Sequence, residues 1–183
     1  MRVIDRRMQV SRRGFLQGSA TAVPAAAVAA AGLAISPEAA WAQEAKVLKP
    51  ATVATLVLVA RDIYPHDRLA TIYYVKAIMP YDGKAGGDAA LKTLLENGAA
   101  RLDSDAMDRH KVAYIAVPWE EQRVELLRGI ELTLFFAKLR GDLLVSLYNQ
   151  KEIWPKFGYE GSSADKGGYI HRGFNDIDWL PQS

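Results

Sequence analysis

The chain has 183 residues, a formal net charge of +2 and no cysteine. The lack of cysteine excludes a disulfide framework, a C-x-x-C-H haem attachment, a thiolate-held iron–sulfur cluster and a cysteine nucleophile. Five of the 23 basic residues lie within the first 13 positions, so that residues 43–183 carry 18 basic and 19 acidic side chains. A nearly neutral chain of this kind argues against nucleic acid as a partner.

Residues 1–42 have the pattern of a twin-arginine signal peptide. In SRRGFLQG, Arg12 and Arg13 are followed by Phe15 and Leu16, and an alanine-rich apolar run extends from Gly18 to Ile35. Paired arginines ahead of an apolar segment are read as an address for export, and this route carries proteins that have already folded. An ordinary export signal and an uncleaved membrane anchor are the alternatives.

The apolar run is followed by a candidate cleavage site. Ala40-Trp41-Ala42 provides the small-x-small pattern that a signal peptidase requires, and it follows the break at Ser36-Pro37. We therefore expect the mature chain to begin at Gln43. The remaining 141 residues are enough for one domain that buries about two-thirds of its unfolded surface.

Apolar residues at helical spacing predict two helices in the first part of this domain. The first begins near Pro50, ends at Pro65 and places five residues on one face: Val53, Leu56, Val57, Ala60 and Tyr64. The second runs from about Leu69 to Met79, where Pro80 and a turn at Tyr81-Asp82-Gly83 end it.

Three further helices are predicted between residues 88 and 148. Asp88 is the expected N-cap of the third, the fourth starts at Pro118, and the fifth, from Leu132 to Tyr148, is expected to form the core. Their apolar positions are Leu91, Leu94, Leu95, Gly98 and Leu102; then Val124, Leu127 and Ile130; then Phe135, Phe136, Leu139, Leu143 and Leu147. Only Val112–Val117 has an ambiguous strand character. The pattern predicts an all-α fold, a small irregular helical bundle over residues 43–148.

Residues 149–183 form a long C-terminal tail with neither helical nor strand periodicity. The 36 residues from Tyr148 onward contain seven aromatic residues and five glycines. Disordered segments are poor in aromatic residues, because each exposed ring forgoes a burial free energy of about 2 kcal/mol. The tail must therefore either wrap its own helices or dock on a partner. Its glycines are expected to supply positive φ angles or close backbone approaches.

The sequence shows no convincing catalytic, cofactor or metal site. His66 beside Asp67 lacks a third ligand at metal-site spacing, and His110 lies in a charged stretch that reads as a solvated loop. Ser162 or Ser163, His171 and Asp176 have the residue types of a nucleophile triad but no G-x-S-x-G elbow. No G-x-G-x-x-G or P-loop is present. These observations favour a binding role.

Several motifs together resemble the gluconate 2-dehydrogenase subunit 3 family. They are RDIYPHD, LFFAKLR, LYNQKEIWPKFGYEG, KGGY and RGFNDIDWLP, together with the twin-arginine leader. The matching tail positions are Trp154, Gly158, Tyr159, Gly161, Gly167, Gly168, Tyr169, Gly173, Phe174, Asn175, Asp176, Asp178 and Trp179. The likeness covers nearly the whole chain, and no catalytic residue is carried over.

The resemblance implies a non-catalytic small subunit of a periplasmic flavoprotein dehydrogenase, associated with the inner membrane through its partners. The partner is a large FAD-bearing subunit of the glucose-methanol-choline type, often joined by a multihaem cytochrome c subunit. The small subunit carries the leader and escorts the folded large subunit. The expected partner-binding residues are Trp154, Tyr159, Tyr169, Phe174 and Trp179. The alternative is a stand-alone periplasmic enzyme or sugar-binding domain, in which Asp176 and Asp178 bind hydroxyl groups.

Overall fold

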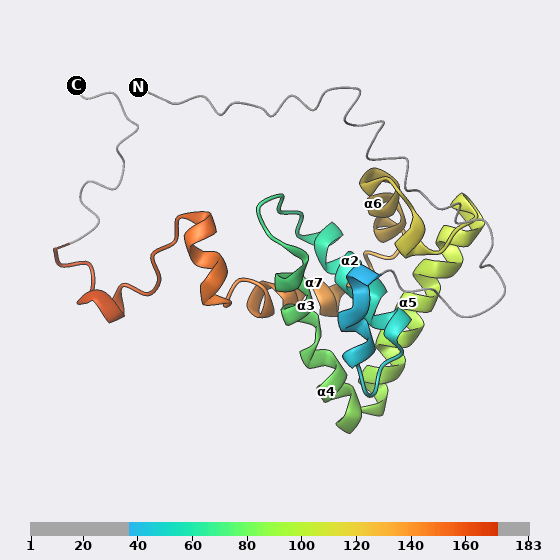
Figure 1. Ribbon diagram of the computed structural model, residues 1–183, viewed down its shortest axis with the longest axis horizontal. Helices are drawn as coiled ribbons and strands as arrows, with labels where there is room; N and C mark the ends of the chain where they lie inside the picture. The colour runs from blue at the N-terminus through green and yellow to red at the C-terminus, as the bar shows by residue number, and fades with distance from the viewer. Residues whose placement is uncertain (1–36, 172–183) are drawn as a thin grey trace, which may run out of the picture. The chain divides into compact units, whose positions relative to one another are not determined.

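The computed structural model describes residues 37–171, with side chains from residue 41 onward. Every regular element in this range is a helix (Figure 1), which confirms the all-α prediction. Its α-helices are α2 (Pro50–Ile63), α3 (Thr71–Ile78), α4 (Pro80–Gly87), α5 (Ala89–His110), α6 (Glu120–Arg128) and α7 (Leu134–Ser146). Short 3-10 helices are η2 (Pro37–Glu44), η3 (Tyr114–Ala116), η4 (Lys151–Phe157) and η5 (Ala164–Lys166). Among residues 37–171, no helix combines the length and the apolar character needed to cross a membrane.

Helix α2 is the central element of the domain. Pro50 occupies its first turn, and the predicted apolar face, Val53, Leu56, Val57 and Ala60, is buried. Val59, which lies off that face, is buried as well, because α3, α5, α6 and α7 all pack against α2. The apolar pattern predicted that the fifth helix would form the core. That helix, α7, buries only Phe135, Leu139 and Leu143 and exposes Leu134, Leu144 and Val145.

Pro80 starts a helix, and the prediction of a turn at Tyr81-Asp82-Gly83 was wrong. Helix α3 ends at Ile78, and Pro80 takes the first position of α4, where proline has no N–H to lose. Tyr81 and Asp82 are buried, and the Tyr81 hydroxyl donates to Asp142 on α7 at 2.7 Å. These tertiary contacts outweigh the local turn propensity of the Asp-Gly pair.

Helix α5 is the longest in the described chain, and Asp88 caps it as predicted by accepting a hydrogen bond from the Leu91 N–H at 2.9 Å. His110 is its last residue, so the expectation of a loop there was wrong. Asp105, one of the two acids whose proximity to His110 suggested a loop, pairs with Arg101 on the surface of the helix at 2.8 Å. Lys111 then adopts φ 62°, the left-handed conformation that ends many helices.

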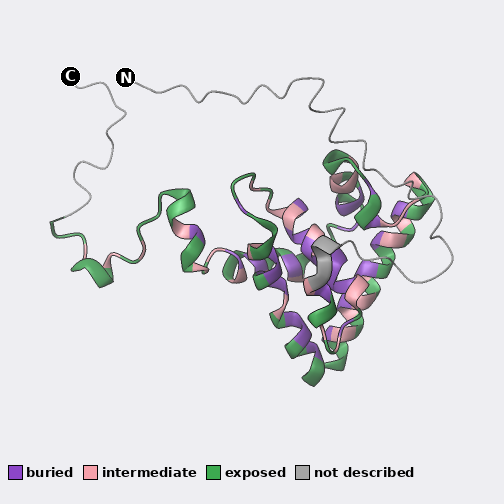
Figure 2. Cartoon of the chain, viewed as in Figure 1, coloured by how far each residue is buried: buried purple, intermediate pink, exposed green. Residues whose placement is uncertain are grey.

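Packing on the helical core continues beyond Tyr148. The chain turns into η4, whose Ile153 is 0% exposed and whose Trp154 lies partly buried against the same core. After Phe157 most residues are exposed (Figure 2). The described tail therefore has an anchored part, residues 149–157, and an exposed part, residues 158–171.

Candidate partner-binding surface

Two of the motifs that carry the family resemblance meet at one place. Their side chains His66 and Tyr148, which are 82 residues apart in sequence, are hydrogen-bonded there. RDIYPHD forms the end of α2 and the loop after it, where the Tyr64 N–H closes the last helical turn on the Ala60 carbonyl. The hydroxyl of Tyr74 donates to the Tyr64 carbonyl at 2.7 Å, and the hydroxyl of Tyr64 donates to the Arg140 carbonyl on α7 at 2.9 Å. The loop is therefore fixed to α3 and α7.

His66 in this loop contacts the beginning of the tail. Its Nε2 lies 2.6 Å from the Tyr148 hydroxyl, and its ring stands edge-on to Tyr148 and to Phe157, with centroids 5.6 and 5.0 Å away. Burial lowers the pKa of His66 below 6.5, although nearby Asp67 opposes this effect. Burial likewise raises the pKa of the Tyr148 phenol. Neutral His66 can therefore accept a hydrogen bond from protonated Tyr148.

Backbone and side-chain bonds hold residues 150–154 on the domain. The Gln150 amide donates to the Tyr73 carbonyl at 2.8 Å, and the Trp154 indole N–H donates to the Tyr148 carbonyl at 2.7 Å. An exposed ion pair joins Lys76 Nζ and Glu152 Oε1 at 3.0 Å. Because Ile153 is also buried, this segment is a structural part of the domain.

The expected partner-binding residues divide into three groups. Trp154 and Tyr159 lie together, with ring centroids 5.2 Å apart in an edge-on arrangement. Tyr159 is 52% exposed, and Tyr169, further along the tail, is 68% exposed. Phe174 and Trp179 lie outside the described residues. Ile170, which was not singled out from the sequence, is 76% exposed and follows Tyr169 directly.

The four tail glycines that the structure describes have the predicted conformations. Gly158, Gly161, Gly167 and Gly168 all have positive φ, between 72° and 96°. At Gly161 a Cβ atom would also lie 3.3 Å from the Trp154 ring. Glycine is the residue that adopts these angles without steric strain, so the path of residues 158–168 depends on it. Nearby, Lys151, Trp154, Pro155, Gly158, Tyr159 and Glu160 line a surface depression of about 370 Å³.

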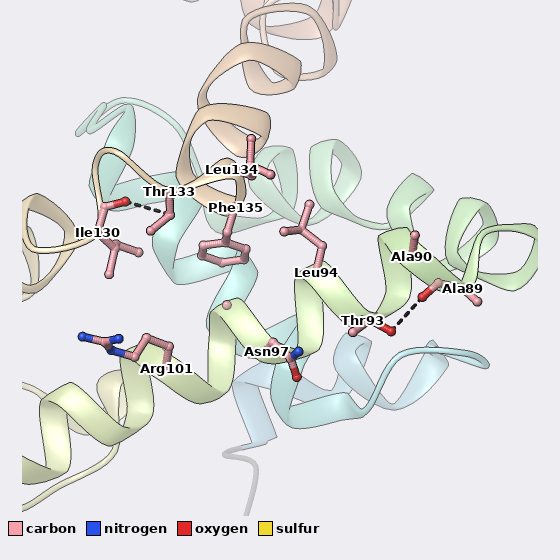
Figure 3. A pocket seen from close by; sticks show the side chains of 11 residues that line it. Ala89, Ala90, Thr93, Leu94, Asn97, Arg101, Ile130, Thr133, Leu134 and Phe135 are labelled. Carbon is pink, nitrogen blue, oxygen red and sulfur yellow. Dashed lines mark hydrogen bonds between the residues drawn. The ribbon is translucent and has the colours of Figure 1, made fainter.

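A second, larger groove was not anticipated from the sequence. It lies between α5 and the start of α7, has a volume of about 740 Å³ and is lined mainly by apolar side chains (Figure 3). The ring of Phe135 lies over α5 beside Leu94, at a place where Gly98 has no side chain to obstruct it. Leu132, which directly precedes the lining residue Thr133, is 97% exposed. The helical period had placed Leu132 inside the fifth helix, and no local signal distinguished it.

The charged network inside the domain was also missed. Asp62 of α2 accepts hydrogen bonds from the Arg123 guanidinium at 2.8 Å on both oxygens and from the Tyr114 hydroxyl at 2.7 Å. Arg123 also donates to the Val117 carbonyl at 2.9 Å. The bond to Asp62 raises the pKa of Arg123, while burial, together with Asp62, raises that of Tyr114. This network ties α6 and η3 to α2.

The export residues are divided between the undescribed and described parts of the chain. Arg12, Arg13, Phe15 and Leu16 lie outside the described residues. Ala40 falls within η2, and Ala42 in the same 3-10 helix is 0% exposed.

The remaining candidates for chemistry have ordinary structural surroundings. The Ser162 hydroxyl accepts a hydrogen bond from the Ala164 N–H at 3.2 Å, while His171 is exposed and Asp176 lies outside the described residues. Glu120 and Glu121 occupy the first turn of α6, where the helix dipole favours acids. Between residues 37 and 171, acidic and histidine side chains form no group of three that could bind a metal ion.

No family model, curated protein or solved structure matches the chain. The family resemblance therefore depends on the sequence motifs alone.

Proposed function

We propose that this chain is the non-catalytic small subunit of a periplasmic flavoprotein dehydrogenase complex. It escorts the folded, FAD-bearing large subunit through the twin-arginine route and stabilises it, while FAD is bound by the large subunit alone. Residues 1–42 are the signal peptide, residues 43–148 the helical domain and residues 149–183 the C-terminal tail, whose exposed part docks on the partner. A multihaem cytochrome c subunit is a further partner of the same complex, which associates with the inner membrane through these subunits.

The observation that carries this proposal is the division of the tail into an anchored and an exposed part. Residues 149–157 are fastened to the domain, so the chain that follows leaves from a defined point. Residues 158–171 then present Tyr159, Tyr169 and Ile170 to the exterior. Tyrosine is among the residues enriched in the buried centre of protein interfaces. A partner that covers these side chains would recover the burial free energy that they forgo in the isolated chain.

The four tail glycines support the same interpretation. A backbone with positive φ at Gly158, Gly161, Gly167 and Gly168 bends repeatedly and can lie close to another surface. An irregular segment of this length can wrap a large area of a partner at the cost of ordering on binding. Two chains that cross a membrane together on one leader need a lasting contact, which implies at least about 1,000 Å² of buried surface.

Co-expression with a glucose-methanol-choline-type flavoprotein that lacks a leader of its own tests the escort role. We expect the flavoprotein to reach the periplasm with the wild-type chain and to stay in the cytoplasm when Arg12 and Arg13 are both changed to lysine, which keeps the charge. The readout is flavin fluorescence and dehydrogenase activity in each cell fraction. A fusion of residues 1–42 directly to the flavoprotein tests the two roles separately. If export is recovered but activity stays low, the small subunit also stabilises the enzyme. Unchanged flavoprotein export without this chain would end the proposal.

A second candidate is a stand-alone sugar-binding domain, and the depression at Trp154 and Tyr159 favours it. The depression combines aromatic rings with the polar groups of Lys151 and Glu160, the mixture that small-molecule sites use. Titration calorimetry of the isolated chain with glucose and gluconate separates the two functions. Saturable binding of either compound that is lost in a Trp154→Ala variant would favour the sugar-binding domain, and the absence of heat would favour the escort.

A further inference from the structure

The segment that contains the predicted cleavage site is packed onto the folded domain. Ala42 in η2 is 0% exposed, and the Trp41 side chain lies partly buried against the core. The Ala45 N–H donates to the Ala42 carbonyl at 3.3 Å. The Ala42–Gln43 bond therefore lies within a 3-10 helix whose small residue faces inward.

Asp82 on α4 holds the chain a few residues after this bond. Its carboxylate accepts hydrogen bonds from three consecutive backbone N–H groups, those of Lys46, Val47 and Leu48, at 2.8–2.9 Å. Burial by itself would raise the pKa of Asp82, but these donors outweigh it and hold the pKa below 3.8. The carboxylate is therefore ionised at neutral pH, and hydrogen bonds to an ionised acceptor are the stronger kind. We call this arrangement the Asp82 clamp.

A peptidase reads its substrate as an extended strand, because the side chains on either side of the bond must enter pockets of the enzyme. A small residue is required at the position before the cut, and here that residue is buried. A chain exported in its folded state brings this packed segment to the peptidase. Cleavage then depends on local opening, and its rate follows the population of the open form.

We propose that the folded domain gates removal of the leader. The Ala42–Gln43 bond is protected while residues 41–48 are packed, and it is hydrolysed when this segment detaches from the Asp82 clamp. Hydrolysis consumes one water and leaves the carboxylate of Ala42 and the ammonium group of Gln43, with the peptidase as catalyst. The inference takes from the proposed function only the leader and the folded route, and it does not depend on any partner.

The test compares the full chain with a leader fusion in detergent micelles that contain a soluble signal peptidase catalytic domain. The fusion joins residues 1–45 through a glycine-serine linker to an unrelated, independently folded protein, which cannot bury Ala42. Intact mass spectrometry follows the appearance of a product that begins at Gln43. We expect the full chain to be cut at least about tenfold more slowly than the fusion, because only a minor open population is cleavable.

An Asp82→Asn variant weakens the clamp, because an amide cannot replace a carboxylate that accepts from three N–H groups. It should be cut about tenfold faster than the wild-type chain. Asp105→Asn, which loses an exposed helix ion pair on α5, should be cut at the wild-type rate.

Three results would overturn the gate. The first is a wild-type chain cut as fast as the fusion, and the second is a fusion that is not cut after Ala42 at all. The third is an Asp82→Asn chain that is folded by circular dichroism yet cut at the wild-type rate. The first two need no variant of the domain, so they hold even if Asp82→Asn fails to fold. Because no partner is present, none of these results bears on the escort role.

Discussion

The imidazole of His66 and the phenol of Tyr148 lie 2.6 Å apart and join the loop after α2 to the start of the tail. This short contact brings together two motifs that are distant in sequence. It also sets the direction in which the exposed tail leaves the domain, because Phe157 packs on the same two rings. The contribution of His66 to stability therefore reports on the attachment of the tail to the domain.

His66 should make stability depend on pH near neutrality. Its pKa is lowered in the folded state, so the unfolded state binds more protons as the pH falls through 6.5. The free energy of unfolding should therefore be highest above pH 6.5 and fall toward the lower folded pKa. A His66→Gln variant should lose this dependence and cost about 1 kcal/mol at pH 7.5, the value of one hydrogen bond.

Thermal unfolding at pH 7.5 and pH 5.5, followed by circular dichroism, measures this difference. Gly141→Ala on α7, which changes no titratable group, is the control and should keep the wild-type pH dependence. An unchanged pH dependence in His66→Gln would show that other groups cause it.

Two truncations should separate the anchored tail from the exposed tail. Removal of residues 159–183 takes away a segment whose described part, residues 159–171, is mostly exposed, and should change the free energy of unfolding by at most about 0.5 kcal/mol. Removal of residues 149–183 also deletes Ile153, whose side chain is fully buried, and should cost about 2–5 kcal/mol. Urea unfolding measures both values.

Both truncated chains should fail to retain the flavoprotein in a copurification. If the chain that ends at Gly158 still retained it at the wild-type level, the exposed tail would not be the docking segment. If that chain were as unstable as the shorter one, residues 159–183 would belong to the folded core.

Replacing Arg123 should be among the most damaging single changes in the domain. Arg123→Met leaves the Asp62 carboxylate buried without its cation, which costs about 3–5 kcal/mol. Arg101→Met removes an arginine from an exposed i,i+4 pair with Asp105 and should cost about 0.5 kcal/mol or less. Chemical denaturation of the two variants gives the comparison. Equal losses would show that the buried pair contributes no more than a surface pair.

Gly98 and Gly141 are both helical glycines but should respond oppositely to alanine. A Cβ on Gly98 would overlap with the buried Phe135 ring, whereas at Gly141 nothing lies within 4 Å. Gly98→Ala should therefore cost about 1–3 kcal/mol through overpacking, and Gly141→Ala should gain about 0.5–1 kcal/mol from helix propensity. Differential scanning calorimetry measures both. A stabilised Gly98→Ala chain would mean that Phe135 moves aside freely.

The features that local sequence determines were predicted well. The apolar stripe of α2, the cap at Asp88 and the positive φ of the tail glycines each depend on neighbouring residues, so a short window contains them. The helix at Pro80 was missed because its stability comes from Tyr81 and Asp82, which bond to segments 61 and 34–36 residues away. Without knowledge of such contacts, Pro80 and the Asp82-Gly83 pair are as compatible with a turn as with the start of a helix.

The same limit applies to the candidate surface. Aromatic density marked the tail, but it could not show that Trp154 faces the domain while Tyr159 and Tyr169 face outward. That division depends on Ile153 and on the pairing of Gln150 with Tyr73, which lies 77 residues earlier. Pairings at this range cannot be predicted from periodicity, because no pattern in one segment specifies its partner in another.

The network of Asp62, Tyr114 and Arg123 has a consequence for how such chains can diverge. Each member satisfies the others inside the domain, so losing one leaves a buried polar group without its partner, while replacing the set with apolar residues of similar volume can be nearly neutral. Sequences in which only one or two of the three residues have been replaced are therefore less stable than either complete set. Positions 62, 114 and 123 should therefore change together, and covariation among them in related chains would reveal this fold even where the rest of the sequence has drifted.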